Sequence, residues 1–94
     1  MRRRRFNLIF HELIGLEVRV KSHTDSSLTG LKGKVVDETK NMLIVESRNG
    51  KVEKIPKFGG IFVFKLSDTV SVEVRGDLIV GRPEERLKRY GGGK

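Results

Sequence analysis

The sequence predicts an all-β fold, a small antiparallel barrel of six or seven short strands with a short α-helix at each end. Apolar and polar side chains alternate through much of the middle of the chain, which is the period of a half-buried strand. Turn-forming residues interrupt that alternation about every eight to twelve residues. Strands this short cannot build a large sandwich, whereas closure into a barrel removes the exposed edges.

The first predicted element is a helix that begins near Asn7 and ends at Gly15. Apolar side chains recur at helical spacing before that glycine, at Phe6, Ile9, Phe10 and Leu13. A helix of this length is marginal alone in water, so its apolar stripe must pack on the barrel or on a partner. We interpret these four residues as a partner-docking stripe, although plain core packing produces the same period.

The alternation then predicts the strands, separated by a polar loop over 22–29 and a turn over 37–41. The expected strands are 16–21, 30–36, 42–48, 51–55, 61–64, 70–75 and a short 78–80. Asn49-Gly50 predicts a hairpin with a type I′ turn. The glycines at the start of the second strand are expected to let it bend strongly. The pattern favours a barrel of the SH3-like or Sm-like type.

A second helix is predicted after Gly81. Pro83 suits the first helical position, Glu84 and Glu85 suit the first turn, and basic residues occupy the last turn. The glycines at 91–93 end it. We therefore divide the chain into a basic arm over residues 1–5, a helix plus barrel over 6–81, and a basic helix with a glycine-rich tail over 82–94.

The positive charge is concentrated at the two ends. The 94 residues carry a net charge of +8, and residues 1–11 contain four arginines and no acid. Residues 82–94 contain five basic and two acidic side chains, so seven of the eight excess charges lie outside residues 12–81. Basic ends on a balanced body are typical of arms that bind a polyanion, although terminal charges that only aid solubility are the alternative.

The barrel also carries candidate phosphate contacts. Lys32 and Lys34 alternate with other residues on one strand and therefore share a face. Edge lysines that only block strand pairing are the alternative for each of these side chains. The candidate RNA-binding residues are Arg2, Arg3, Arg4, Arg5, Lys32, Lys34, Arg48, Lys51, Lys54, Lys57, Arg82, Arg86, Lys88 and Arg89. Few aromatic residues lie outside apolar runs, which favours structured RNA read through shape and phosphates.

Catalytic chemistry is not predicted. The chain has no cysteine and two isolated histidines, His11 and His23, which make a poor metal site. Adjacent acidic residues such as Asp37-Glu38 point to opposite faces of a strand and do not form a catalytic pair. We therefore expect no catalytic residue, no metal ligand and no bound cofactor. No apolar run is long enough to span a bilayer, so we also expect no membrane association.

Several segments, taken in order, resemble the archaeal ribonuclease P protein component 1 family. They are His11-Glu12-Leu13-Ile14-Gly15-Leu16, the run from Ser26-Ser27-Leu28-Thr29-Gly30 to Val35-Val36-Asp37-Glu38-Thr39, Asn41-Met42-Leu43-Ile44-Val45, Ile55-Pro56-Lys57 and Gly81-Arg82-Pro83-Glu84-Glu85-Arg86. The resemblance extends over roughly residues 6–89.

This resemblance implies an Sm-like barrel that is a non-catalytic subunit of ribonuclease P, the ribonucleoprotein that removes the 5′ leader of precursor tRNA. The catalyst is then an RNA that uses Mg²⁺. The implied partners are the RNase P RNA, whose specificity domain the protein stabilises, a zinc-ribbon subunit in a heterodimer, and the other protein subunits. Precursor tRNA is contacted indirectly, and the compartment is the archaeal cytoplasm. The alternatives are an SH3-like ribosomal RNA-binding protein, a ring-forming Sm-type RNA chaperone and, more distantly, an independent nuclease.

Overall fold

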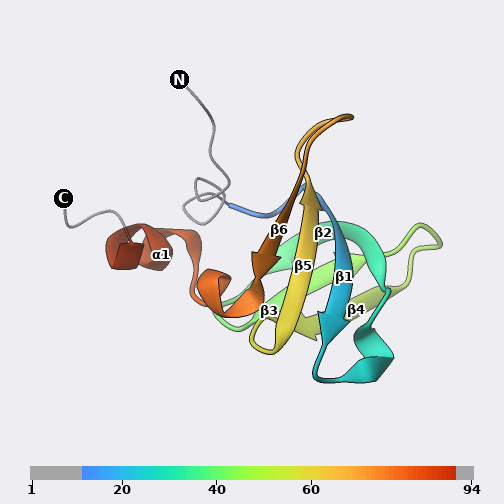
Figure 1. Cartoon of the computed structure of the whole chain (residues 1–94), viewed down its shortest axis with the longest axis horizontal. Coiled ribbons are helices and arrows are strands. Elements are labelled where there is room, and N and C mark those ends of the chain that lie inside the picture. The colour runs from blue at the N-terminus through green and yellow to red at the C-terminus, as the bar shows by residue number, and fades with distance from the viewer. Residues whose placement is uncertain (1–11, 91–94) are drawn as a thin grey trace.

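A computed structural model describes residues 12–90, and the side chains up to residue 88 (Figure 1). The strands and the helix, in chain order, are β1 (Glu17–His23), β2 (Lys32–Glu38), β3 (Met42–Glu46), β4 (Val52–Pro56), β5 (Gly60–Lys65), β6 (Ser71–Arg75) and α1 (Pro83–Tyr90). Short 3₁₀ helices span Ser26–Leu28 and Gly76–Ile79. No helix within residues 12–90 has the length and apolar character needed to cross a membrane.

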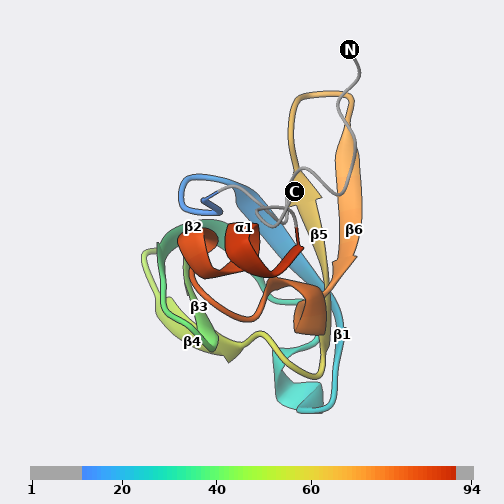
Figure 2. The ribbon, with the colours of Figure 1, turned by 90° about the vertical axis from the view of Figure 1, so that its left-hand side faces the viewer.

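The strands form one antiparallel sheet in the order β4-β3-β2-β1-β5-β6. Figure 2 shows the sheet bending back on itself, with β3 and β4 on one side, β5 and β6 on the other, and α1 beside them. The alternating apolar side chains of the strands meet inside this bend. The buried core consists of Leu13, Val18, Val20, Val35, Leu43, Val45, Ile55, Phe62, Phe64, Val72, Val74 and Ile79.

The bend depends on β2, which is shared by the two halves of the sheet. Residues 32–34 pair with β1, whereas residues 34–38 pair with β3. A Cβ atom on Gly33 would lie 2.3 Å from the carbonyl oxygen of Glu46, so only glycine allows β3 to approach this closely. A register shift between Val35 and Asp37 adds to the bend.

The predicted all-β barrel-like fold and the C-terminal helix are confirmed, and six of the seven predicted strands are present. The predicted strand 78–80 is wrong, because residues Gly76–Ile79 form a 3₁₀ helix. The predicted type I′ turn is also wrong. Gly50 has a φ of 87°, but no residue other than glycine has a positive φ in the described chain, so Asn49 lacks the conformation that this turn requires. The chain instead turns through residues 47–50, closed by Gly50 N–H donating to the Ser47 carbonyl at 2.9 Å.

The predicted second strand was placed too early along the chain. It begins at Lys32 and continues to Glu38, into the predicted turn, because Glu38 pairs with Leu43 and turns its side chain inward.

The predicted N-terminal helix falls almost entirely outside the described residues. Its last apolar residue, Leu13, is described and is fully buried in the barrel core. Leu13 is therefore corrected from a partner-docking residue to a core residue. Phe6, Ile9 and Phe10 lie outside the described residues, and so do the arginines at 2–5.

Candidate nucleic-acid interface

A groove runs over the outer face of the sheet, where β1 lies between β2 and β5. Glu17 and Arg19 of β1 point away from the core, because Val18 and Val20, which alternate with them, are buried. The β3–β4 turn and the start of β6 complete the walls. The lining residues are Glu17, Val18, Arg19, Lys32, Gly33, Lys34, Glu46, Ser47, Arg48, Gly50, Val63, Lys65 and Ser71.

The strand register sets how the charges follow one another across this face. Glu17 lies opposite Lys34 of β2 on one side and opposite Lys65 of β5 on the other. Lys34 in turn lies opposite Glu46 of β3. Charges of opposite sign therefore alternate along this row, as favourable cross-strand pairs do.

The groove as a whole is basic. Five lining residues are cationic, namely Arg19, Lys32, Lys34, Arg48 and Lys65, against the two acids Glu17 and Glu46. Within residues 12–88, none of these five cations is within ion-pair distance of a carboxylate. Exposed cations without carboxylate partners are available to phosphate groups, so this face can bind a polyanion.

The structure places the predicted RNA-binding residues in three settings: the groove, exposed positions outside it, and a buried cluster. Lys32, Lys34 and Arg48 come together in the groove. Exposed positions outside its lining are occupied by Lys51, Lys54, Arg82 and Lys88, of which Lys51 makes an ion pair with Glu53 at 3.3 Å. The side chain of Arg89 is not among the side chains that the structure describes.

Two groove cations, Arg19 and Lys65, were missed in the sequence. The alternation of β1 does put Arg19 on the solvent face, opposite to Val18 and Val20. The register that sets Arg19 beside Lys32, and Lys65 beside Glu17, depends on which strands pair. Alternation alone does not specify that pairing.

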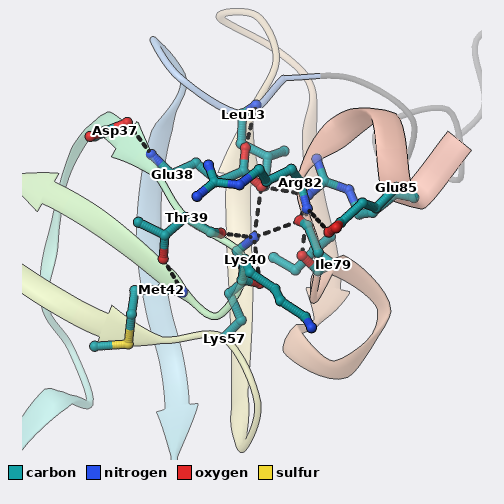
Figure 3. Close-up of polar contacts among 12 residues, drawn as sticks. Leu13, Asp37, Glu38, Thr39, Lys40, Met42, Lys57, Ile79, Arg82 and Glu85 are labelled. Atoms are coloured by element: carbon teal, nitrogen blue, oxygen red, sulfur yellow. Dashed lines mark hydrogen bonds and ion pairs between the residues drawn. The ribbon is translucent and has the colours of Figure 1, made fainter.

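Lys57 and Arg86 are corrected from RNA contacts to buried structural residues, because both side chains are 0% exposed. They share the carboxylate of Glu38, which is itself buried at the end of β2. Lys57 Nζ lies 2.8 Å from Glu38 Oε2, and Arg86 Nη1 donates to the same oxygen from α1. Figure 3 shows Lys57 pointing into the middle of this network.

Backbone carbonyls complete the polar environment of the buried cluster. Lys57 Nζ also donates to the carbonyls of Thr39 at 2.8 Å and Gly81 at 2.9 Å. Arg86 Nη1 donates to the carbonyls of Gly81 and Ile79. Two cations thus share one carboxylate, and carbonyl dipoles offset the remaining positive charge. The cluster fastens α1 and the preceding turn to the end of β2.

Burial lowers the pKa of the Lys57 ammonium from its ordinary value of 10.5, against the opposing effect of Glu38, which raises it. Because the folded chain holds this proton less tightly, the unfolded chain binds more protons between the lowered pKa and 10.5. The contribution of Lys57 to the unfolding free energy therefore increases as pH rises across that interval. The same contribution is lost as pH falls back through the lowered pKa.

We predict that Lys57→Met removes this alkaline rise. Denaturant unfolding of the wild type and the variant at a series of pH values up to 10.5 measures the difference between them. The free energy of unfolding of the wild type is expected to increase relative to that of the variant as pH increases. A difference that stays constant over the interval would contradict the lowered pKa.

Comparisons with known proteins agree with the sequence resemblance. The model of the family "Ribonuclease P/MRP, subunit p29" matches residues 6–89. The "Ribonuclease P protein component 1" of Desulfurococcus amylolyticus is 51% identical over 82 residues, which cover 87% of this chain and 89% of that protein. The protein of the same name from Staphylothermus marinus is 44% identical over 88 residues, covering 94% and 96% of the two chains.

A solved structure supports the same assignment. Its description is "Structure of Mth11: A homologue of human RNase P protein Rpp29", and it is 42% identical with a TM-score of 0.60. The match covers 81% of this chain and 97% of that one. The ribosomal alternative is not favoured by any of these matches. The family match over residues 6–89, together with relatives of this similarity and coverage, shows that the chain belongs to the ribonuclease P/MRP subunit p29 family and is a protein subunit of ribonuclease P.

Proposed function

We propose that the protein binds ribonuclease P RNA through the outer face of its sheet, with the groove between β2, β1 and β5 as the contact surface. The observation that carries this proposal is the gathering of five cations around one groove without carboxylate partners among residues 12–88. Long-range attraction to RNA scales with such charges, and phosphate contacts fix the position of a protein on a nucleic acid.

The lining also indicates how the RNA is recognised. It contains no aromatic side chain on which a base could stack. Phe58 is 73% exposed but belongs to the β4–β5 turn, outside this lining. Contacts to the backbone of folded RNA fit the groove better than the reading of single-stranded bases. The protein then acts by stabilising RNA structure, and we assign it to the specificity domain of the RNA.

The remaining partners follow from the family. We expect a heterodimer with a zinc-ribbon subunit, docked through Phe6, Ile9 and Phe10, and contacts with the other protein subunits in the cytoplasm. Cleavage of precursor tRNA is assigned to the RNA and its Mg²⁺, so the protein needs no bound cofactor or catalytic residue of its own. Basic side chains replace part of the cation screening that the folded RNA requires.

The test is a salt titration of RNA affinity with single variants Lys34→Ala, Arg48→Ala and Lys65→Ala. A cation that neutralises a phosphate contributes about 0.7 to 0.9 to the slope of log affinity against log salt concentration, so each variant is expected to flatten the slope by that amount. Affinity at low salt should fall severalfold. The cognate ribonuclease P RNA is the ligand in every titration.

Lys40→Ala is the matched control. Lys40 is exposed and lies in the β2–β3 turn, at the opposite end of β3 from Arg48 and outside the groove lining. The Lys40→Ala substitution removes the same charge from the protein without changing any residue of the groove. If Lys40→Ala weakened binding as much as the three groove variants, the attraction would depend on net charge alone and the groove would not be the site.

A further inference from the structure

The groove contains one cross-strand pair in which both residues are cationic. Arg19 of β1 lies directly opposite Lys32 of β2. The hydrogen bonds between these strands fall on alternate rows that do not include Arg19 and Lys32: Val20 N–H donates to the Leu31 carbonyl at 2.8 Å, and Val35 N–H donates to the Leu16 carbonyl at 2.9 Å. Arg19 and Lys32 therefore form a non-hydrogen-bonded pair, the kind whose side chains come closest together.

No acid of this face lies directly opposite Arg19 or Lys32 in the register. Glu17 lies between Lys34 and Lys65, and Glu46 lies opposite Lys34. On the far side of Arg19 the next residue in the register is the uncharged Val63. Beyond it is Glu73, whose carboxylate is held by Lys21 at 2.8 Å.

Two like charges placed directly opposite each other destabilise a sheet. The chain could remove this cost by an acid at either position, as it does in the adjacent row, where Glu17 faces Lys34. Instead both side chains are exposed beside a groove that Arg48 also lines. An anion bound between them would remove the repulsion and gain charge-assisted hydrogen bonds from both.

We propose that Arg19 and Lys32 together hold one phosphate of the RNA backbone, and that this pair is the main anchoring point of the groove. This inference rests on the proposed function of the groove and names its central contact. It assigns Arg19 to RNA binding. It also predicts that RNA affinity and the stability of the free protein respond in opposite directions when the pair is changed.

The experiment uses the full chain with Lys32→Glu and, separately, Arg19→Glu, measured by thermal melting and by affinity for the cognate ribonuclease P RNA. Either change turns the repulsive pair into an attractive one, so the melting temperature should rise by a few degrees. RNA affinity should fall by roughly tenfold or more, as expected for the loss of a charge-assisted hydrogen bond to phosphate. Arg19→Lys, which keeps the charge, should retain most of the affinity.

Lys34→Glu is the matched control, because it makes the same charge change one row away. It sets three acids side by side at 17, 34 and 46, so it should lower the melting temperature. A rise for Lys32→Glu together with a fall for Lys34→Glu would show that the change in stability comes from the like-charged pair and not from the charge change itself.

Each of the other outcomes would contradict one part of the proposal. If Lys32→Glu and Arg19→Glu left RNA affinity unchanged while the alanine variants at 34, 48 and 65 weakened it, the groove would bind RNA but the pair would not anchor it. If Lys32→Glu lowered both melting temperature and affinity, the pair would be a structural element, and the inference would be overturned. If no groove variant changed affinity, the proposed function itself would fail.

Discussion

Replacing Glu38 by glutamine is expected to destabilise the protein by about 3–5 kcal/mol, because the buried ammonium of Lys57 and the guanidinium of Arg86 would lose the carboxylate that they share. For a chain of this size each kcal/mol corresponds to about 4–8 °C in melting temperature. The expected fall is therefore about 12 °C or more. The amide keeps the shape of the side chain, so the loss reports on charge rather than on a cavity.

Glu73→Gln is the control for this measurement. Glu73 makes an ion pair with Lys21 at 2.8 Å, but both side chains are half exposed, and such pairs contribute about 0–1 kcal/mol. Thermal melting of the two variants under the same conditions compares a buried carboxylate with a surface one. If Glu38→Gln melted within a few degrees of Glu73→Gln, the carbonyls around Lys57 and Arg86 would be sufficient partners and the assigned role of Glu38 would be wrong.

Much of the fold could be predicted because one face of each strand packs against the core. Val18 and Val20 in β1, and Val72 and Val74 in β6, alternate with exposed residues, and this period is visible in the sequence. The three residues 78–80 are all apolar, so they show no alternation that would distinguish a strand from another buried segment. The sequence pattern predicts a strand there. In the structure Gly76 approaches Lys57 so closely that a Cβ atom on it would lie 1.6 Å from the Lys57 carbonyl oxygen, and the chain turns at Gly76 into a 3₁₀ helix.

The buried cluster could not be predicted from composition. Glu38, Lys57 and Arg86 look like surface residues, because charged side chains are rarely buried unless paired. Their pairing joins residues 19 and 48 positions apart in the sequence. Local patterns carry no information on such contacts, so two of these residues were wrongly assigned to RNA binding.

The candidate site was predictable in part, for a related reason. Lys32 and Lys34 share a face because residues two apart on a strand always do. Arg19 and Lys65 join them only because β1 lies between β2 and β5 in the sheet order. The distribution of charge along the sequence indicates the chain ends as the basic segments. The structure shows that residues 12–81, in which basic and acidic side chains are nearly equal in number, still form a basic groove.

The two sources of positive charge can be separated by removing residues 1–5, which lie outside the described part of the chain. This deletion takes away four arginines, whereas residues 12–81 carry 11 basic against 10 acidic side chains. If most of the four neutralise phosphates, the salt slope of RNA affinity should flatten by roughly two to three units. Between 50 and 200 mM salt, that change corresponds to roughly one to two orders of magnitude in affinity.

A variant with lysines at positions 2–5 keeps the charge and should keep the slope. Thermal stability should be almost unchanged in both proteins, because these residues lie outside every apolar pattern of the sequence. The measurement is a salt titration of affinity for the cognate ribonuclease P RNA with the full-length, truncated and lysine-substituted chains. An unchanged slope after truncation would show that the arm makes no phosphate contacts. The groove, where Arg19 and Lys32 face each other, would then account for the salt dependence of binding.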